Sequence, residues 1–151
     1  MQSHASAVVR PLERQDKSQW SELWRDYLAF YETERTPEIH DLYFERLLGD
    51  DPQDYLCLVA ERNGTLLGLT HYLFHRHGWS AENVCYLQDL YAVPAARGTG
   101  VGRMLIEAVY EAADAQGAPQ VYWLTQDFNT QARKLYDRIG VKTPFIKYTR
   151  A

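Results

Sequence analysis

The sequence predicts an α/β (α+β) fold, with a mixed and mostly antiparallel central sheet flanked by about four helices. Three observations support this prediction. Strand-like and helix-like segments follow one another in the order β-α-α-β-β-β-α-β-α-β. The pair Asn63-Gly64 stands between two apolar runs and indicates a tight hairpin turn. A glycine-rich segment, residues 93–103, joins a strand-like run to an amphipathic helix.

The N-terminal third predicts one strand and two helices. Residues 8–12 have the pattern of a short strand. Asp16 is typical of a helix N-cap, and the apolar residues that follow it recur at helical spacing up to Tyr31. A Thr-Pro-Glu sequence at residues 36–38 begins the second helix, because proline is favoured at the first helical position, and Gly49 ends it.

The rest of the chain continues with elements of both kinds. Runs of alternating or β-branched residues predict strands, and apolar residues at helical spacing bounded by glycine predict helices. In order, the expected elements are strands over 55–61, 66–75 and 83–93, a helix over 100–116, a strand over 121–125, a helix over 129–139 and a closing strand over 145–149.

Length and composition limit the class of protein. The 151 residues contain no internal repeat or linker, so we expect a single domain over 8–151 after a flexible N-terminus, residues 1–7. A net charge of −4 argues against a general nucleic-acid binder, and no apolar run is long enough to cross a membrane. Residues 1–7 lack the apolar core of a signal peptide.

The cysteines and the other potential metal ligands indicate the cellular compartment and whether a metal site is expected. Cys57 and Cys85 lie in apolar runs, and we expect buried free thiols in a cytoplasmic protein. No Cys, His and Asp residues have the spacing of a metal site, so no metal is expected.

The glycine-rich segment predicts an anion site. Glycines at alternate positions, Gly98, Gly100 and Gly102, let a ligand approach the backbone closely, and the following helix directs its free N–H groups and positive dipole end there. A diphosphate is the natural ligand. A Walker A loop requires Lys and Ser or Thr, where this chain has Arg103-Met104, and a dinucleotide fingerprint requires Gly-x-Gly-x-x-Gly.

The sequence Arg97-x-x-Gly100-x-Gly102 resembles the coenzyme A loop of the GNAT superfamily of N-acetyltransferases. A second block resembles the other signature helix of that family. It reads Asn129-x-x-Ala132-x-x-Leu135-Tyr136-x-x-x-Gly140. The resemblance covers nearly the whole chain from residue 8, and the order of elements matches the GNAT fold; the N-terminal third matches by pattern only. Residues 121–148 look most like a small subgroup that acetylates polyamines and histone tails.

The resemblance implies an acetyl-CoA-dependent N-acetyltransferase in which a primary amine attacks the thioester directly in a ternary complex. The acceptor would be a polyamine, another small amine or a lysine side chain, free or in a peptide. Two alternatives stay open: a non-catalytic module that binds an acyl-CoA, and an acyltransferase with another acyl donor or acceptor. The closing strand also suggests a homodimer.

The resemblance also implies the cofactor site. Backbone groups of the strand before the glycine turn would bind the acetyl group and the pantetheine arm, and an N–H of Leu90 or Tyr91 would polarise the carbonyl. Arg97 and Arg103 would add charge, although a solvated surface position, or a pair between Arg103 and Glu107, explains them as well. Asn129 would hydrogen-bond the pantetheine arm, although capping alone accounts for it. The implied cofactor-binding residues are Leu90, Tyr91, Ala92, Val93, Arg97, Gly98, Thr99, Gly100, Val101, Gly102, Arg103, Asn129 and Ala132.

Tyr136 is the candidate general acid for the leaving thiolate, since the family places a tyrosine there. A phenol with a pKa of about 10 stays protonated at neutral pH and is acidic enough to help a thiol leaving group of pKa about 8.5. A core aromatic on the apolar side of its helix is the alternative.

The sequence offers several candidates for the general base. Some relatives carry Glu where this chain has Gln88, which cannot accept a proton. Asp89 is the candidate, but it faces the opposite side of the strand unless a bulge turns it. It would act through a water or orient the substrate, or instead pair with an arginine. His71 and His75 share one face of their strand and are further candidates, unless they are structural.

The family places the acceptor pocket between the first two helices and their loop. Residues 27–41 mix carboxylates with aromatics, which suits a cationic amine. A solvated acidic helix face explains the same residues. The substrate candidates are Tyr27, Tyr31, Glu32 and Gln88.

Overall fold

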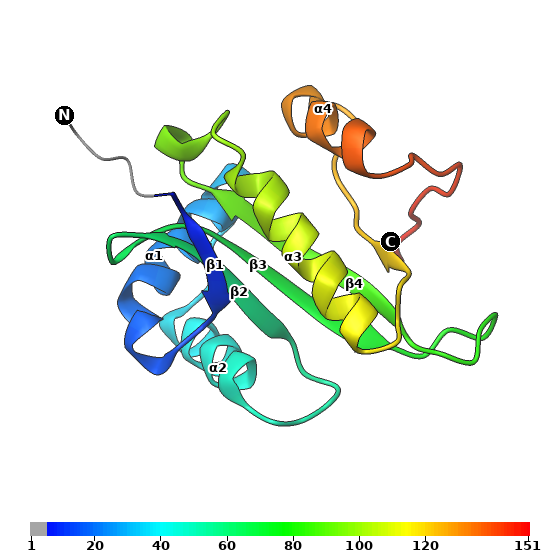
Figure 1. Cartoon of the computed structure of the whole chain (residues 1–151), viewed down its shortest axis with the longest axis horizontal. Coiled ribbons are helices and arrows are strands. Elements are labelled where there is room, and N and C mark those ends of the chain that lie inside the picture. The colour runs from blue at the N-terminus through cyan, green and yellow to red at the C-terminus, as the bar shows by residue number, and fades with distance from the viewer. Residues whose placement is uncertain (1–5) are drawn as a thin grey trace.

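Residues 6–151 are described by a computed structural model, in which a five-stranded sheet has helices on both faces (Figure 1). The predicted flexible N-terminus falls mainly on residues 1–5, which lie outside the described residues. The strands are β1 (Val8–Pro11), β2 (Leu56–Arg62), β3 (Thr65–His75), β4 (Val84–Ala92) and β5 (Val121–Tyr122). The helices are α1 (Lys17–Phe30), α2 (Pro37–Leu48), α3 (Val101–Ala115) and α4 (Thr130–Ile139), with 3₁₀ turns η1 (Arg14–Asp16) and η2 (Pro94–Ala96).

The sheet has the simple order β1-β2-β3-β4-β5. The first four strands pair antiparallel, and β5 alone runs parallel to its neighbour β4. This confirms the predicted mixed, mostly antiparallel sheet. The hairpin between β2 and β3 turns at Asn63 and Gly64, whose φ angles of 52° and 80° are those a two-residue hairpin of this kind requires.

Two hydrophobic layers hold the helices on the sheet. Helices α1 and α2 cover one face, and α3 lies across the other (Figure 1). On the first face Trp20 and Phe44 pack against strand residues such as Leu69, all fully buried. On the second face Leu105, Ile106 and Val109 of α3 are fully buried against the sheet. The period of two along the strands supplies both layers with side chains.

Asp16 occupies the predicted N-cap position of α1, but its side chain makes no capping hydrogen bond to that helix. It accepts the Glu13 backbone N–H at 2.8 Å and binds both terminal nitrogens of Arg10, at 2.8 and 2.9 Å. The hydrogen bonds from Arg10 hold the pKa of the Asp16 carboxyl below its usual value. The carboxylate thus ties β1 to the start of α1.

The closing strand predicted over residues 145–149 is wrong. No strand forms there, and the predicted strand over 121–125 shortens to Val121–Tyr122. A strand exists only where a neighbour supplies a hydrogen-bonding ladder. Since β5 offers just two residues, the segment after α4 finds no partner within residues 6–151. Phe145 and Tyr148 are accordingly 77% and 87% exposed.

Gly68 of β3 lies in close contact with both β4 and α3. A Cβ at this position would lie 2.7 Å from the backbone oxygen of Tyr91 and 3.1 Å from side-chain atoms of Val101 and Leu105. We expect Gly68→Ala to lower the free energy of unfolding by about 1–3 kcal/mol, because a backbone oxygen cannot move aside as a side chain does. Urea unfolding measures the change.

Gly78 provides the matched control for this substitution. A Cβ there would meet no atom of residues 6–151 within 4 Å. We expect Gly78→Ala to change the free energy of unfolding by less than about 0.5 kcal/mol. Equal stability of the two variants would contradict the close packing around Gly68.

Candidate active site

The glycine turn adopts a backbone that only glycine accepts easily. Gly98 and Gly100 have φ angles of 80° and 91°, in the left-handed region, and a Cβ on either would point into open space. Gly100 is also the N-cap of α3, so the left-handed residue directly precedes the helix. The turn therefore depends on backbone conformation rather than on packing.

Free amides gather at this turn. The backbone N–H groups of Gly98, Gly100, Val101, Gly102 and Arg103 donate to no carbonyl within residues 6–151. Free N–H groups at a helix N-terminus, together with the helix dipole, form an anion site. A diphosphate group fits the chemistry of this donor set.

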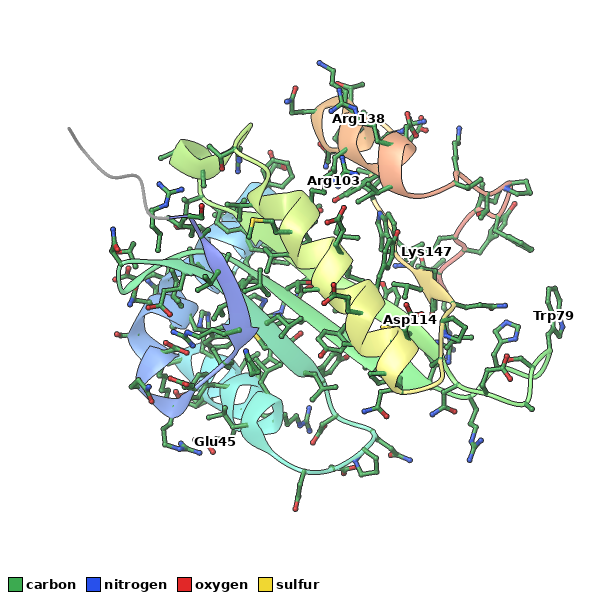
Figure 2. The ribbon with its side chains drawn as sticks, viewed as in Figure 1. Glu45, Trp79, Arg103, Asp114, Arg138 and Lys147 are labelled. Carbon is green, nitrogen blue, oxygen red and sulfur yellow. The ribbon has the colours of Figure 1, made fainter. Side chains whose placement is uncertain are left out.

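Other members of the predicted loop take part differently. The amides of Arg97 and Thr99 are used inside the turn, donating to Pro94 at 3.2 Å and Ala96 at 3.2 Å, so they are not free for a ligand. The Arg103 side chain binds Glu107 at 2.7 Å, one turn further along α3. Figure 2 shows Arg103 toward the N-terminal end of that helix.

Arg97 contributes charge beside the turn instead. Its guanidinium lies 5.8 Å from the centre of the Tyr91 ring, and its Nε donates to the Ala92 carbonyl at 3.3 Å. The side chain remains exposed and makes no ion pair within the described residues.

The sheet opens beside β4. Strands β4 and β5 pair only at Cys85 with Val121 and at Tyr86 with Tyr122. Beyond this point the outer edge of β4 has no neighbouring strand within residues 6–151. This edge connects the middle of the sheet to the glycine turn.

The ladder with β3 decides which amides face the opening. The Val93 N–H donates to Leu67 on the β3 side at 2.9 Å. Because antiparallel residues alternate between bonded and non-bonded pairs, Tyr91 also turns its N–H to β3, while Leu90 and Ala92 turn theirs outward. Of the four strand residues predicted for the cofactor, Tyr91 and Val93 therefore have their amides in the sheet.

A bulge in β4 gathers the acidic residue and its neighbour on one side. His71 pairs with Asp89 and Tyr72 pairs with Leu87, so Gln88 is an extra residue. Leu87 packs on the α3 face, whereas Gln88 and Asp89 both line the cavity beside α1 and α2. The bulge required for Asp89 to face the acceptor side is thus present.

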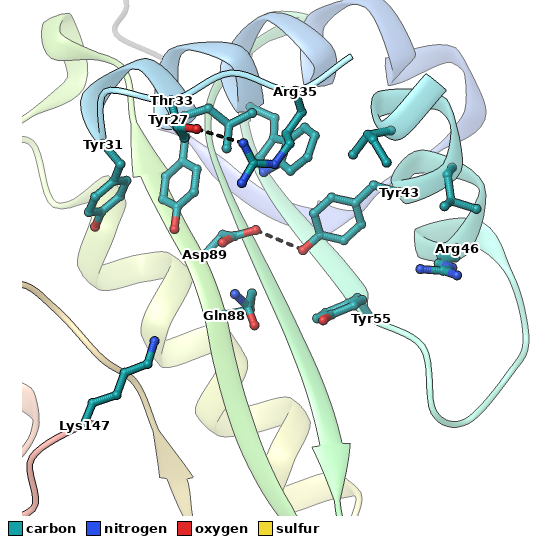
Figure 3. A pocket seen from close by; sticks show the side chains of 14 residues that line it. Tyr27, Tyr31, Thr33, Arg35, Tyr43, Arg46, Tyr55, Gln88, Asp89 and Lys147 are labelled. Carbon is teal, nitrogen blue, oxygen red and sulfur yellow. Dashed lines mark hydrogen bonds between the residues drawn. The ribbon is translucent and has the colours of Figure 1, made fainter. Parts of the chain in front are cut away.

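Asp89 is buried, and its partners are known. One carboxylate oxygen, Oδ2, accepts from the Tyr43 hydroxyl at 2.9 Å (Figure 3). The same oxygen lies 2.7 Å from Nδ1 of His71. The alternative of an arginine partner is therefore wrong. Burial raises the pKa of the Asp89 carboxyl, but the hydrogen bonds from His71 and the nearby tyrosines lower it more, and the net pKa lies below its usual value. The surroundings of Asp89 therefore favour the ionised carboxylate.

His71 serves to hold Asp89. The indole N–H of Trp20 donates to His71 Nε2 at 2.9 Å, and an indole can only donate. The proton of this fully buried imidazole is therefore on Nδ1, which donates to Asp89. Both ring nitrogens are occupied, so His71 has no free site to act as a base. His75, the other candidate, bonds Tyr122 at 2.7 Å and does not line the cavity.

The cavity beside Asp89 has a volume of about 680 Å³ and opens between α1, α2 and β4 (Figure 3). Tyr27, Tyr31 and Gln88 line it as expected, but Glu32 does not. Glu32 stands in the turn after α1 with a φ of 56° and is exposed. The sequence pattern gave no sign of the other polar residues that line this cavity, which are Thr33, Arg35, Tyr43, Arg46, Tyr55 and Lys147.

Burial and the charge of Asp89 raise the pKa of both Tyr27 and Tyr43. Their hydroxyls remain protonated donors around the carboxylate. Helical spacing placed Tyr43 among apolar residues of α2, so its polar role was missed.

Helix α4 carries the remaining predicted residues. Asn129 caps it, accepting the Ala132 N–H at 3.5 Å, and also donates to Thr125 at 3.3 Å. Tyr136 is half-buried and packs edge-on against Trp123 with ring centres 5.5 Å apart. Burial raises the pKa of the Tyr136 phenol to about 12. No hydrogen bond of this hydroxyl occurs in the part of the chain that the structure describes.

Two further findings concern the described residues as a whole. Among residues 6–151, no three His, Cys, Asp or Glu side chains are grouped so that they could hold a metal ion. None of the helices over that range is both long and apolar enough to span a membrane. Cys57 and Cys85 are buried free thiols, as predicted.

Free backbone amides thus lie at one end of an opened strand, and a cavity lined by polar side chains lies at the other. Comparisons with known proteins identify the family of this chain. A profile of the acetyltransferase (GNAT) family matches residues 18–141. The D-amino-acid N-acetyltransferase HPA3 of Saccharomyces cerevisiae is 38% identical over 144 residues, covering 95% of this chain and 89% of that protein.

Two other relatives extend the comparison. The thialysine N-epsilon-acetyltransferase of Bos taurus is 33% identical over 96 residues, covering 58% of this chain and 56% of that protein. A solved structure of the aminoglycoside N-acetyltransferase AAC(6')-Iy in complex with CoA superposes with a TM-score of 0.85 at 18% identity, covering 99% of this chain and 97% of that one. The chain belongs to the GNAT acetyltransferase family and is an N-acetyltransferase.

Proposed function

We propose that this enzyme transfers the acetyl group of acetyl-CoA directly to the primary amine of a small substrate in a ternary complex. D-Amino acids, on which the yeast relative acts, belong to the candidate acceptors. We also propose a cytoplasmic location, which the two buried free thiols support.

One observation carries the proposal: the open outer edge of β4 connects the two halves of the site. The free amides of residues 98–103 lie at one end of this edge, and Asp89 lies at the other. Between them, Leu90 and Ala92 turn their N–H groups toward the opening. A diphosphate at the turn and an extended arm along the strand would bring an acyl group beside the acceptor cavity.

The residues have distinct roles in this proposal. Acetyl-CoA supplies a thioester whose carbonyl the amine attacks. The five free amides of the glycine turn bind the diphosphate, with Arg97 adding positive charge. The outward N–H of Leu90 donates to the carbonyl oxygen as negative charge develops on it. Asn129 and Ala132 at the start of α4 would border the pantetheine arm.

The proton balance follows from two residues. An alkyl amine with a pKa of about 10.4 arrives protonated, and it must lose that proton before it attacks. Solvent takes this first proton. As the C–N bond forms, the attacking nitrogen becomes positively charged, and Asp89 takes its second proton, directly or through a water. The C–S bond then breaks, and the Tyr136 hydroxyl gives its proton to the departing sulfur. Solvent returns a proton to Tyr136, and Asp89 releases its own.

Calorimetry with acetyl-CoA and a thiol-release assay with a panel of amines test the proposal. We expect one-to-one binding of acetyl-CoA, together with thiol release that depends on the amine. Binding without turnover on any amine would favour an acyl-CoA-binding module instead. The absence of any binding would overturn the proposed cofactor site.

We also propose a homodimer formed through the segment after α4. Val141, Phe145, Ile146 and Tyr148 are all at least 76% exposed, and large exposed side chains this close together in the chain support an interaction site. A second copy would supply the strand partner that this segment and the short β5 lack. Pairing about a two-fold axis satisfies both copies at once.

If the protein is a dimer, light scattering should give a mass twice the 17.5 kDa of one chain. We expect Phe145→Asp to reduce the mass to that of one chain, because a buried unpaired charge opposes association. Trp79, which is 86% exposed at the tip of the loop between β3 and β4, provides the control (Figure 2). Trp79→Asp should leave the mass unchanged. A wild-type mass of 17.5 kDa in dilute solution would exclude the dimer.

A further inference from the structure

The acceptor cavity has a charge opposite to that of the chain. Three cationic side chains line it, Arg35, Arg46 and Lys147, against one carboxylate, Asp89. The chain as a whole carries a net charge of −4. The acidic residues that the sequence offered between α1 and α2, including Glu32 and Glu34, do not line the cavity. A purely cationic acceptor such as a polyamine would therefore meet a repulsive field.

The carboxylate of Asp89 is already hydrogen-bonded, but the cationic side chains are free to bind an anion. Within residues 6–151 neither Arg35 nor Lys147 has a carboxylate within ion-pair distance, and Arg46 has Asp54 only at 4.0 Å. An unpaired guanidinium in a cavity is a binding group for an anion.

Arg35 is also held in place. Its Nη1 donates to the hydroxyl of Thr33 at 2.8 Å and to the backbone carbonyl of Glu34 at 2.6 Å. These two contacts fix the side chain on the cavity side of the turn between α1 and α2. Figure 3 shows Arg35 and Asp89 directed into the same cavity, with Tyr27 and Tyr43 nearby. A restrained guanidinium loses less conformational entropy when it binds an anion.

A second donor at the cavity lacks a partner. Trp24 lines the cavity and is buried, and its indole N–H makes no hydrogen bond in the part of the chain that the structure describes. A buried N–H without an acceptor costs free energy, which a ligand oxygen would recover. Within residues 6–151 the Trp24 indole thus lacks an acceptor, and the Arg35 guanidinium lacks a carboxylate partner.

We propose that the acceptor is a small amino acid in the chemical sense, a primary amine that also carries an anionic group. Arg35 binds this anion, a carboxylate or a phosphonate, and the amine lies toward Asp89. This inference rests on the proposed acetyl transfer and adds the substrate class and a specificity-determining residue. The cations have a second effect, since like charges nearby disfavour the ammonium form and help the amine lose its proton.

The proposal is tested with acceptors that have or lack an anionic group. Alanine and 1-aminoethylphosphonate have one, whereas ethylamine and spermidine do not. We expect the wild-type enzyme to favour alanine, the phosphonate or both over ethylamine by at least about 100-fold in kcat/KM. Both enantiomers of alanine belong in the panel.

The variants Arg35→Gln and Arg35→Lys identify the residue. We expect Arg35→Gln to raise KM for the preferred anionic acceptor and lower its kcat/KM by about 10- to 100-fold, while ethylamine changes less than about twofold. Arg35→Lys should recover part of the loss, since it keeps the charge but not the two-pronged geometry. Arg76→Gln, at an exposed arginine outside the cavity, is the matched control and should change nothing.

Two results would overturn the inference: equal use of ethylamine or spermidine and the anionic acceptors, or an Arg35→Gln loss that is the same for all amines. Calorimetric binding of N-acetylalanine gives a readout without turnover. Weaker binding to Arg35→Gln than to Arg76→Gln supports the anion site, and equal binding opposes it. Failure of every amine to be acetylated would contradict acetyl transfer, while this binding comparison still judges the anion site separately.

Discussion

Replacing Asp89 by Asn is expected to lower kcat/KM for the amine by about 10²- to 10⁴-fold. Among residues 6–151 this carboxylate is the only acidic group that lines the acceptor cavity, and the amide cannot accept the proton that the amine nitrogen loses as the C–N bond forms. Steady-state thiol release measures the loss. Acetyl-CoA affinity should change little, because the glycine turn lies at the other end of the β4 edge.

Tyr43→Phe is the matched control for this prediction. It removes one hydrogen bond to Asp89 and leaves the negative charge and the His71 contact in place. We expect it to cost less than tenfold in kcat/KM. If Asp89→Asn keeps wild-type turnover and thermal stability, the carboxylate neither takes the proton nor binds the ammonium.

The pH dependence separates Asp89 from its substrate. Because the pKa of Asp89 lies below its usual value, the group stays ionised from weakly acidic pH upward and produces no loss of activity there. The acid limb of kcat/KM then belongs to the amine, which reacts only after it loses its proton. The limb should follow the acceptor, from about pH 8 for a dipeptide α-amino group to about 10.4 for an alkyl amine. A limb that stays at one pH for both would assign it to the enzyme.

Replacing Tyr136 by Phe is the second change with a large expected effect, a loss of about 100-fold or more in kcat with an unchanged dissociation constant for acetyl-CoA. Burial raises the pKa of this phenol to about 12, so it keeps its proton until the thiolate needs it. The ring and its contact with Trp123 remain in the variant, which limits the change to the hydroxyl.

Tyr110→Phe tests whether any tyrosine beside α4 would give the same result. The Tyr110 hydroxyl donates to the carbonyl of Ile139 at 2.7 Å and joins α3 to the end of α4. Its loss should lower the melting temperature and leave kcat within a factor of two or three. If Tyr136→Phe behaves in the same way, Tyr136 is a core aromatic and another donor protonates the sulfur.

Local sequence patterns were sufficient for most of the fold. Thr36 and Pro37 begin α2 as their residue types predict, and Asn63-Gly64 forms the hairpin. These features depend on the conformations that a few adjacent residues allow. The predicted closing strand does not form, because a strand depends on hydrogen bonds to a neighbouring strand that is distant in sequence. The two-residue β5 does not supply such a neighbour.

The candidate active site also has one part that local sequence predicts and one part that depends on the tertiary structure. The sequence by itself determined the glycine turn, because left-handed glycines and a helix N-terminus are local properties of residues 98–103. Only the tertiary structure decided the acceptor side. The bulge at Gln88, the Trp20–His71–Asp89 chain and the placement of Arg35 and Lys147 in one cavity all join residues far apart in sequence. Their chemistry arises from packing between elements, which no short sequence pattern records.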